Sequence, residues 1–143
     1  MRLTSAAMTD ADFLEAIENC HYPIADFHHA EHLRLGWLLL SKMDWESASA
    51  RAARAIRRLT AHYGLEGRYH ETITQAWMRL LASHDEQDFS EFLTRHGDRA
   101  TLDLLHRHWR PETLMSAHAR AHWIEPDLES LPPIKFEPAW LRR

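Results

Sequence analysis

The stretch FHHAEHLRLGWLLL, residues 27–40, decides the fold because its apolar residues recur with the period of an α-helix. At 3.6 residues per turn, Leu33 and Leu40 fall on one face, and His29 lies on that same face. His32 lies at the edge of the apolar stripe. The segment therefore predicts an amphipathic helix whose first turn directs histidines toward the protein core.

A second stretch, YHETITQAWMRLL at residues 69–81, shows the same arrangement. Counted at the helical period, His70 shares a face with Thr74, Trp77 and Leu81. A buried imidazole needs partners for both of its ring nitrogens. Three inward-facing histidines near the starts of two helices therefore require a chemical explanation.

Helical periodicity continues through most of the chain, which contains only 4 glycines and 6 prolines. The sequence predicts an all-α protein, a bundle of about seven helices. Cap residues, glycines and prolines place these helices at about residues 10–19, 27–42, 44–63, 69–83, 89–96, 99–109 and 111–123. Thr9, Asp26, Asp44 and Asp88 are the expected N-caps.

The last segment, PDLESLPPIKFEPAWLRR, holds four of the prolines and cannot form a regular helix. Because it also carries Ile134, Phe136 and Trp140, we expect an extended Pro-rich tail packed on the bundle. The predicted organisation is thus one helical domain over residues 1–125 and a tail over residues 126–143. A disordered end is the alternative interpretation.

The composition of the 143 residues, with 45% hydrophobic and 27% charged, is typical of a single globular domain. A net charge of −4 and the lack of a basic recognition helix argue against nucleic acid as a partner. The single Cys20 excludes an internal disulfide, and no segment reads as a membrane span or a signal peptide. We therefore expect a soluble cytoplasmic protein.

Short connections make consecutive helices antiparallel neighbours. The helices that start near His29 and near His70 are then expected to begin at the same end of the bundle, which would bring His29, His32 and His70 together. Convergence of such side chains from separate segments is what a functional site requires.

Metal binding is the function that these three histidines favour most. His29 and His32 are three residues apart on one helix, and His70 could complete a triad of imidazole ligands. Glu71 or Asp26 could supply a fourth ligand or orient a ring nitrogen. Such a set suits a divalent metal: Zn(II), or Fe(II) or Mn(II) when a carboxylate joins.

Two other interpretations stay open. The histidines could be core residues hydrogen-bonded to threonine, tyrosine or backbone carbonyls. Alternatively, a pair such as His70–Glu71 or His32–Asp26 could act as a catalytic general base without metal.

Two aromatic residues lie on the same helical faces as the histidines. Trp37 and Trp77, with Thr74, could line a ligand or cofactor pocket above the histidines. Packing in the protein core is the simpler interpretation of both tryptophans.

The strings HAEHLRLGW (29–37) and YHETITQAW (69–77) resemble the signature segments of a family of small bacterial hypothetical proteins. That family carries an H-x-x-H-L-R-L-x-W motif followed by a Y-H-x-T-x-T motif. The resemblance covers mainly the second to fourth predicted helices and implies no activity. It implies that His29, His32, His70, Thr72 and Thr74 are the positions of interest.

The sequence thus favours a helical protein that binds a divalent metal and a small molecule at a histidine-lined site, with a metal-dependent enzyme as one form of this function. The alternative is a metal-free module that binds a small ligand or a partner and uses its histidines as polar core groups.

Overall fold

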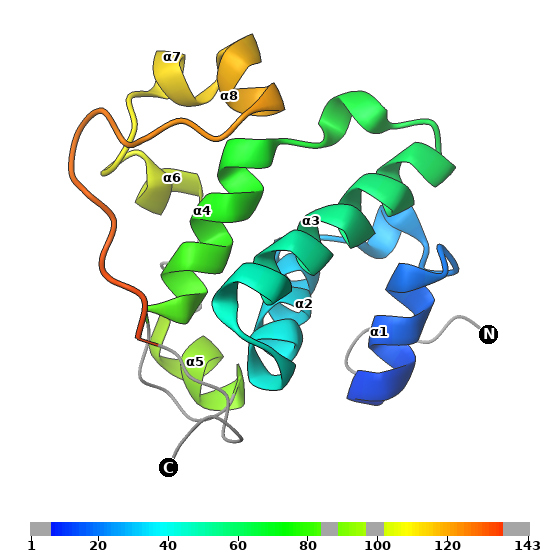
Figure 1. Cartoon of the computed structure of the whole chain (residues 1–143). Helices are drawn as coiled ribbons and strands as arrows, with labels where there is room; N and C mark the ends of the chain where they lie inside the picture. The colour runs from blue at the N-terminus through cyan, green and yellow to red at the C-terminus, as the bar shows by residue number, and fades with distance from the viewer. Residues whose placement is uncertain (1–6, 84–88, 97–101, 136–143) are drawn as a thin grey trace. The chain divides into compact units, whose positions relative to one another are not determined.

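In the computed structural model, which describes residues 7–83, 89–96 and 102–135, every regular element is helical (Figure 1). This confirms the predicted all-α class. The chain divides into two units, residues 1–69 and 70–143, and each is described by itself. Among the described residues, no helix is both long and apolar enough to span a membrane.

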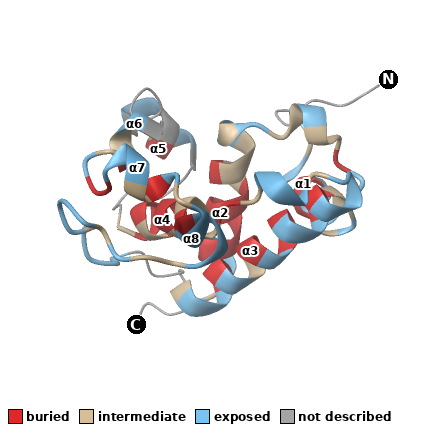
Figure 2. Cartoon of the chain, turned by 90° about the horizontal axis from the view of Figure 1, so that it is seen from above, coloured by how far each residue is buried: buried red, intermediate tan, exposed pale blue. Residues whose placement is uncertain are grey.

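The described residues of the first unit, 7–69, form three α-helices and two short 3₁₀ helices: α1 (Asp10–Glu18), η2 (Ile24–Asp26), α2 (His29–Lys42), α3 (Trp45–His62) and η3 (Glu66–Arg68). Helix α3 packs against both α2 and α1. Its alanine-rich face is buried whereas its arginines lie largely outside, as the colours along α3 show in Figure 2. Small side chains let neighbouring helices approach closely, which favours this packing.

The helix ends of this unit follow the sequence signals closely. Thr9 Oγ1 accepts a hydrogen bond from the Asp12 amide at 3.1 Å, and Asp44 Oδ1 accepts one from the Ser47 amide at 2.8 Å. Both residues are N-caps, as predicted. After α3, Gly64 takes a φ of 70°, a conformation that costs glycine little.

Helix α2 begins two residues later than predicted, and its N-cap is His28 rather than Asp26. Asp26 belongs to η2 instead. The Glu31 carboxylate accepts a hydrogen bond from the His28 amide at 2.9 Å, which stabilises the start of the helix. Upstream, Cys20 follows α1 with a φ of 59°, so the only cysteine occupies a left-handed helix terminus.

Charged side chains connect α1 to the other helices of the unit. Arg51 on α3 binds both carboxylate oxygens of Glu18 on α1, at 2.6 and 2.7 Å. This hydrogen bonding lowers the pKa of Glu18. Arg34 on α2 binds Asp10 at 2.9 Å, and its guanidinium lies 4.3 Å from the ring centroid of Phe13. Arg51–Glu18 is partly buried and bidentate, the geometry in which an ion pair contributes most, whereas Arg34 binds the exposed Asp10.

In the part of the second unit that the structure describes there are five α-helices: α4 (Glu71–Ala82), α5 (Phe89–His96), α6 (Leu102–Leu105), α7 (Pro111–Leu114) and α8 (Ala117–Ala121). Helix α4 packs against α8, which in turn contacts α7. The predicted N-cap Asp88 and residues 97–101 lie outside the described part of the chain.

The single helix predicted over residues 111–123 is wrong, because the chain forms α7 and α8 with a break at Met115 and Ser116. The hydroxyl of Ser116 donates to the carbonyl of Thr113 at 2.8 Å and accepts from the amide of Ala119 at 3.1 Å. Serine prefers such a capping role to a position inside a helix.

After α8 the chain forms an extended strap, residues 123–135, that runs along α4 (Figure 1). Its two ends are fixed to opposite ends of that helix. The amide of Ile124 donates to Thr72 Oγ1 at 3.3 Å, and the amide of Lys135 donates to the carbonyl of Ala82 at 2.6 Å. The remainder of the predicted tail, with Phe136 and Trp140, lies outside the described residues.

The middle of the strap is fixed elsewhere, to the segment between α6 and α7. Leu128 donates its amide to the carbonyl of His108 at 3.0 Å. Asp127 accepts from the Arg110 amide at 3.0 Å and from the Thr113 hydroxyl at 2.6 Å. These contacts lower the pKa of Asp127, with the Thr113 hydroxyl as the main cause. The strap therefore leaves α4 and returns to it.

Replacing Thr72 with valine should destabilise the protein. The Thr72 hydroxyl is fully buried, donates to the His122 carbonyl at 2.7 Å and accepts from Ile124. Valine keeps the shape but removes the partner of two partly buried backbone groups, so urea denaturation should show a loss of about 1–3 kcal/mol. Thr74→Val, in the same helix, is the control and should lose clearly less. Equal losses would contradict this role of Thr72.

Candidate functional site

The predicted metal ligands belong to different units of the chain. His29 and His32 lie in the first turn of α2, in the first unit, and both are partly buried. His70 precedes α4 in the second unit and is buried, with 7% of its surface exposed. The prediction that the three rings share one metal stays a prediction, and the chemistry of each histidine is considered where it lies.

His32 joins a cluster of aromatic rings in the first unit. Its ring lies 4.3 Å from that of Phe27, which contacts Tyr22 edge-on at 6.1 Å, and Tyr22 contacts Phe13 in the same manner at 5.6 Å. Burial lowers the pKa of His32 to about 4, and the neighbouring His29 acts in the same direction. His32 is therefore a neutral imidazole at physiological pH.

This low pKa predicts that the protein loses stability in mild acid. A histidine in the unfolded chain titrates near pH 6.5, whereas His32 in the fold titrates near pH 4. Between these values only the unfolded chain takes up the proton, so the stabilisation is present above pH 6.5 and is lost as the pH falls toward 4. At about 1.4 kcal/mol per pKa unit, the full loss is on the order of 3 kcal/mol.

Urea denaturation at a series of pH values measures this effect. His32→Gln removes the titrating group and should flatten the dependence between pH 6.5 and 4 relative to wild type. His62→Gln, at an exposed histidine of the same unit, is the matched control and should keep the wild-type slope. A His32→Gln protein with an unchanged slope would rule out His32 as the source.

His70 uses both ring nitrogens within the fold. As N-cap of α4, its Nδ1 accepts a hydrogen bond from the Ile73 amide at 3.1 Å. Its Nε2 lies 2.7 Å from the carbonyl oxygen of Leu114, at the end of α7. Since Nδ1 accepts, the ring proton must be on Nε2, which donates to Leu114. This pairing fixes one neutral tautomer.

The pKa of His70 is lowered chiefly by burial; the hydrogen bond to Leu114 opposes this, and the positive charge of Arg120 adds to it. A metal ligand needs a ring nitrogen with an accessible lone pair. In His70, Nδ1 is engaged by the helix cap and Nε2 carries the proton. Coordination would therefore require breaking either the cap or the bond to Leu114. The structure thus explains the burial of His70 by hydrogen bonding, one of the alternatives open from sequence.

Substitutions at residue 70 should separate the two hydrogen bonds. Asn resembles the Nδ1 side of the ring and retains a capping acceptor, whereas Gln can extend a donor toward Leu114. His70→Ala loses both and should reduce the free energy of unfolding by about 1–3 kcal/mol, with Asn and Gln each losing less. Thermal and urea denaturation measure the series. If alanine proved as stable as the wild type, the capping role would be wrong.

The other predicted site residues differ in how far they are buried. Trp37 and Trp77 are buried, at 4% and 6% exposure, as expected of core residues. The proposed general base Glu71 lies in the first turn of α4, where its carboxylate accepts a long hydrogen bond of 3.4 Å from Gln75. Asp26 in η2 and Thr74 in α4 are partly buried.

Among the described residues, no three or more histidine, cysteine, aspartate or glutamate side chains are grouped so that they could hold a metal ion. His118 on α8 and His122, which directly follows the helix, are both exposed, with ring centroids 5.1 Å apart. His108 is buried, and its Nδ1 lies 2.8 Å from the carbonyl oxygen of Glu129 in the strap. Like His70, it serves a structural contact.

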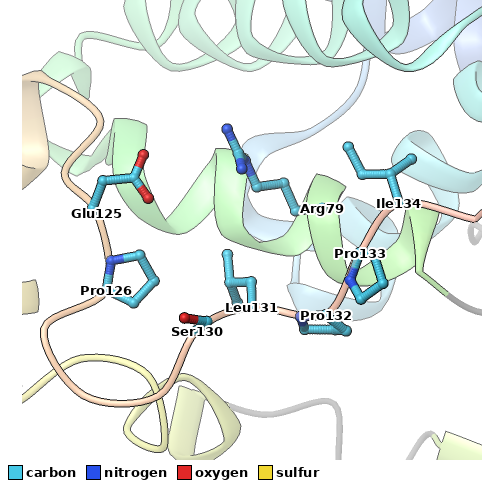
Figure 3. Close-up of a pocket in the computed structure, with 8 residues that line it drawn as sticks. All are labelled: Arg79, Glu125, Pro126, Ser130, Leu131, Pro132, Pro133 and Ile134. Carbon is cyan, nitrogen blue, oxygen red and sulfur yellow. The ribbon is translucent and has the colours of Figure 1, made fainter.

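A hollow of about 310 Å³ lies between α4 and the strap, within the second unit (Figure 3). Arg79 from α4 lines one side, and Glu125, Pro126 and residues 130–134 of the strap line the other. Its volume falls at the lower end of the range for small-molecule sites, roughly 300–1,000 Å³. The hollow follows from the way the strap leaves α4 in the middle and rejoins it at Lys135.

Trp123, at the start of the strap, orients both charged groups of the hollow. The Arg79 guanidinium lies over the indole face, 4.4 Å from the ring centroid. The indole Nε1–H donates to the Glu125 carboxylate at 3.0 Å. Trp123 in turn contacts the fully buried Trp109 edge-on at 5.6 Å, and Trp109 donates to the carbonyl of Ile124 at 3.2 Å. An aromatic pair therefore holds the two ionic side chains in place.

Sequence reasoning did not find this arrangement. One local signal was present: Arg79 is a charged residue between the apolar Met78 and Leu80 on a largely apolar helix. The proline-rich composition identified the strap, but nothing local connects Arg79 with Trp123 and Glu125, more than forty residues away.

Comparison of the chain with protein-family models, curated proteins and solved structures finds no match to any of them. The argument for a function therefore depends on the residues and contacts described above.

Proposed function

We propose that this protein is a metal-free, small-ligand-binding helical module whose binding site is the hollow between α4 and the strap. The observation that carries the proposal is a hollow of small-molecule size in which two oriented charges lie beside apolar residues of the strap. Concave sites with a few precisely placed polar groups are typical of ligand binding. The histidines are then polar structural groups.

The bonding of His70 supports this choice over the metal hypothesis. Both of its nitrogens are used in the fold, so metal binding would have to compete with the α4 cap or with the Leu114 bond. The metal site at His29, His32 and His70 remains a prediction from sequence, and the experiment below includes it.

Ligand binding can be detected by thermal denaturation against a library of small metabolites. A ligand that binds only the folded state stabilises it by RT ln(1 + [L]/Kd), about 2.7 kcal/mol at a ligand concentration of 100 Kd. Ser130→Trp places a large side chain at the hollow from an exposed position and should abolish the stabilisation. Ser90→Trp, exposed on α5, is the control and should preserve it.

The same melts with and without EDTA, together with elemental analysis of untagged protein, test the metal hypothesis. We expect identical wild-type melts and no stoichiometric metal. A bound metal that EDTA removes with loss of stability, and that His70→Ala fails to retain, would contradict the metal-free function. Ligand hits that persist in Ser130→Trp would place the site outside the hollow.

A further inference from the structure

We infer that the hollow between α4 and the strap recognises a small zwitterion of the α-amino-acid class, with its carboxylate at Arg79 and its ammonium at Glu125. This inference rests on the proposed function and names the ligand class of that site. It is drawn from the two opposite charges, the chemistry of the strap wall and the size of the hollow.

Arg79 provides the anion-binding side. A guanidinium has five N–H donors in a planar fork, so it can keep the contacts it already makes and still receive a carboxylate. Its position over the Trp123 face fixes the plane in which those donors point. The side chain is partly buried, which strengthens its interaction with an anion compared with a fully exposed arginine.

Glu125 provides the cation-binding side. One carboxylate oxygen accepts from the Trp123 indole at 3.0 Å, and a carboxylate has further lone pairs for an ammonium group. Figure 3 shows Glu125 and Arg79 extending toward one another from the strap and from α4. The same indole therefore orders a cation and an anion at one hollow.

The strap wall favours an ammonium group and an aliphatic side chain. Pro126, Pro132 and Pro133 have no backbone N–H, so at these positions the backbone offers only carbonyl acceptors. Leu131 and Ile134 add apolar surface beside them. This combination suits a ligand that donates hydrogen bonds from one end and buries a short hydrocarbon group.

A ligand with only one charge fits the site less well. A carboxylic acid would bring no cation to the Glu125 carboxylate, and an amine would bring no anion to the Arg79 guanidinium. Each would partly desolvate one charge of the site without adding an opposite charge beside it, so the site discriminates against both. The volume of about 310 Å³ suits an amino acid better than a nucleotide or a cofactor.

The test uses three probes of nearly the same hydrocarbon shape: L-leucine, isocaproic acid, which lacks its amino group, and isoamylamine, which lacks its carboxylate. Isothermal titration calorimetry of the full chain should detect leucine binding, and the affinities for the other two probes should be weaker by about tenfold or more. Amide NMR shifts on titration with leucine should concentrate at Arg79, Glu125 and residues 130–131.

Charge-removing variants identify the two contacts. Glu125→Gln keeps an oxygen for the Trp123 indole, so the fold is preserved while the ammonium partner is lost. This variant should bind leucine about tenfold more weakly and should bind isocaproic acid as well as wild type or better. Arg79→Gln should weaken the binding of both leucine and isocaproic acid. Glu112→Gln and Arg58→Gln, at exposed residues that do not line the hollow, are matched controls and should bind leucine as wild type.

Failure of leucine to bind, or equal binding of the single-charge probes, overturns the zwitterion assignment. If the metabolite library still gives hits that Ser130→Trp abolishes, the small-ligand function stands and only the ligand class is wrong. If the library gives no such hits, both the zwitterion assignment and the proposed function are wrong.

Discussion

The first turn of α4 organises the second unit, because side chains at this turn find partners in segments far along the chain. The first amides of a helix lack intrahelical acceptors, and His70 supplies one through Nδ1. That choice makes Nε2 a donor, which binds the Leu114 carbonyl at the end of α7. Two residues on, the Thr72 hydroxyl joins the His122 carbonyl and the Ile124 amide. Two separate segments, the end of α7 and residues 122–124, thus meet at the first turn of α4.

The prolines of the strap lie between the residues that anchor it. The strap donates backbone hydrogen bonds from Ile124, Leu128, Glu129 and Lys135. Pro126 and residues 132–133 lie between them and cannot donate. The strap is therefore held at intervals and remains extended between them, which leaves the hollow. The same prolines that exclude a helix from this segment also line the hollow.

Much of the fold could be predicted from local signals, and the exceptions have physical reasons. Thr9, Asp44 and Gly64 mark helix ends correctly because a cap is satisfied within four residues of itself. The sequence predicts His70 inside its helix, whereas in the structure it is the N-cap of α4. A helical periodicity does not separate the two positions, because a core-facing residue of the first turn and a buried N-cap fall on the same face. Its second partner, Leu114, lies 44 residues away and leaves no local trace. The candidate ligand hollow could not be predicted for the same reason.

Residue 70 shows why the same histidine pattern can suggest a metal and serve a structural purpose. An asparagine or aspartate caps a helix well, but its side chain ends at the position of Nδ1. The imidazole continues across the ring to a second nitrogen, so one side chain can satisfy the Ile73 amide and the Leu114 carbonyl together. This requires the neutral ring, which burial favours. Metal ligation also requires a neutral imidazole. Periodicity and burial therefore cannot separate the two roles, and only the partners of both nitrogens decide between them.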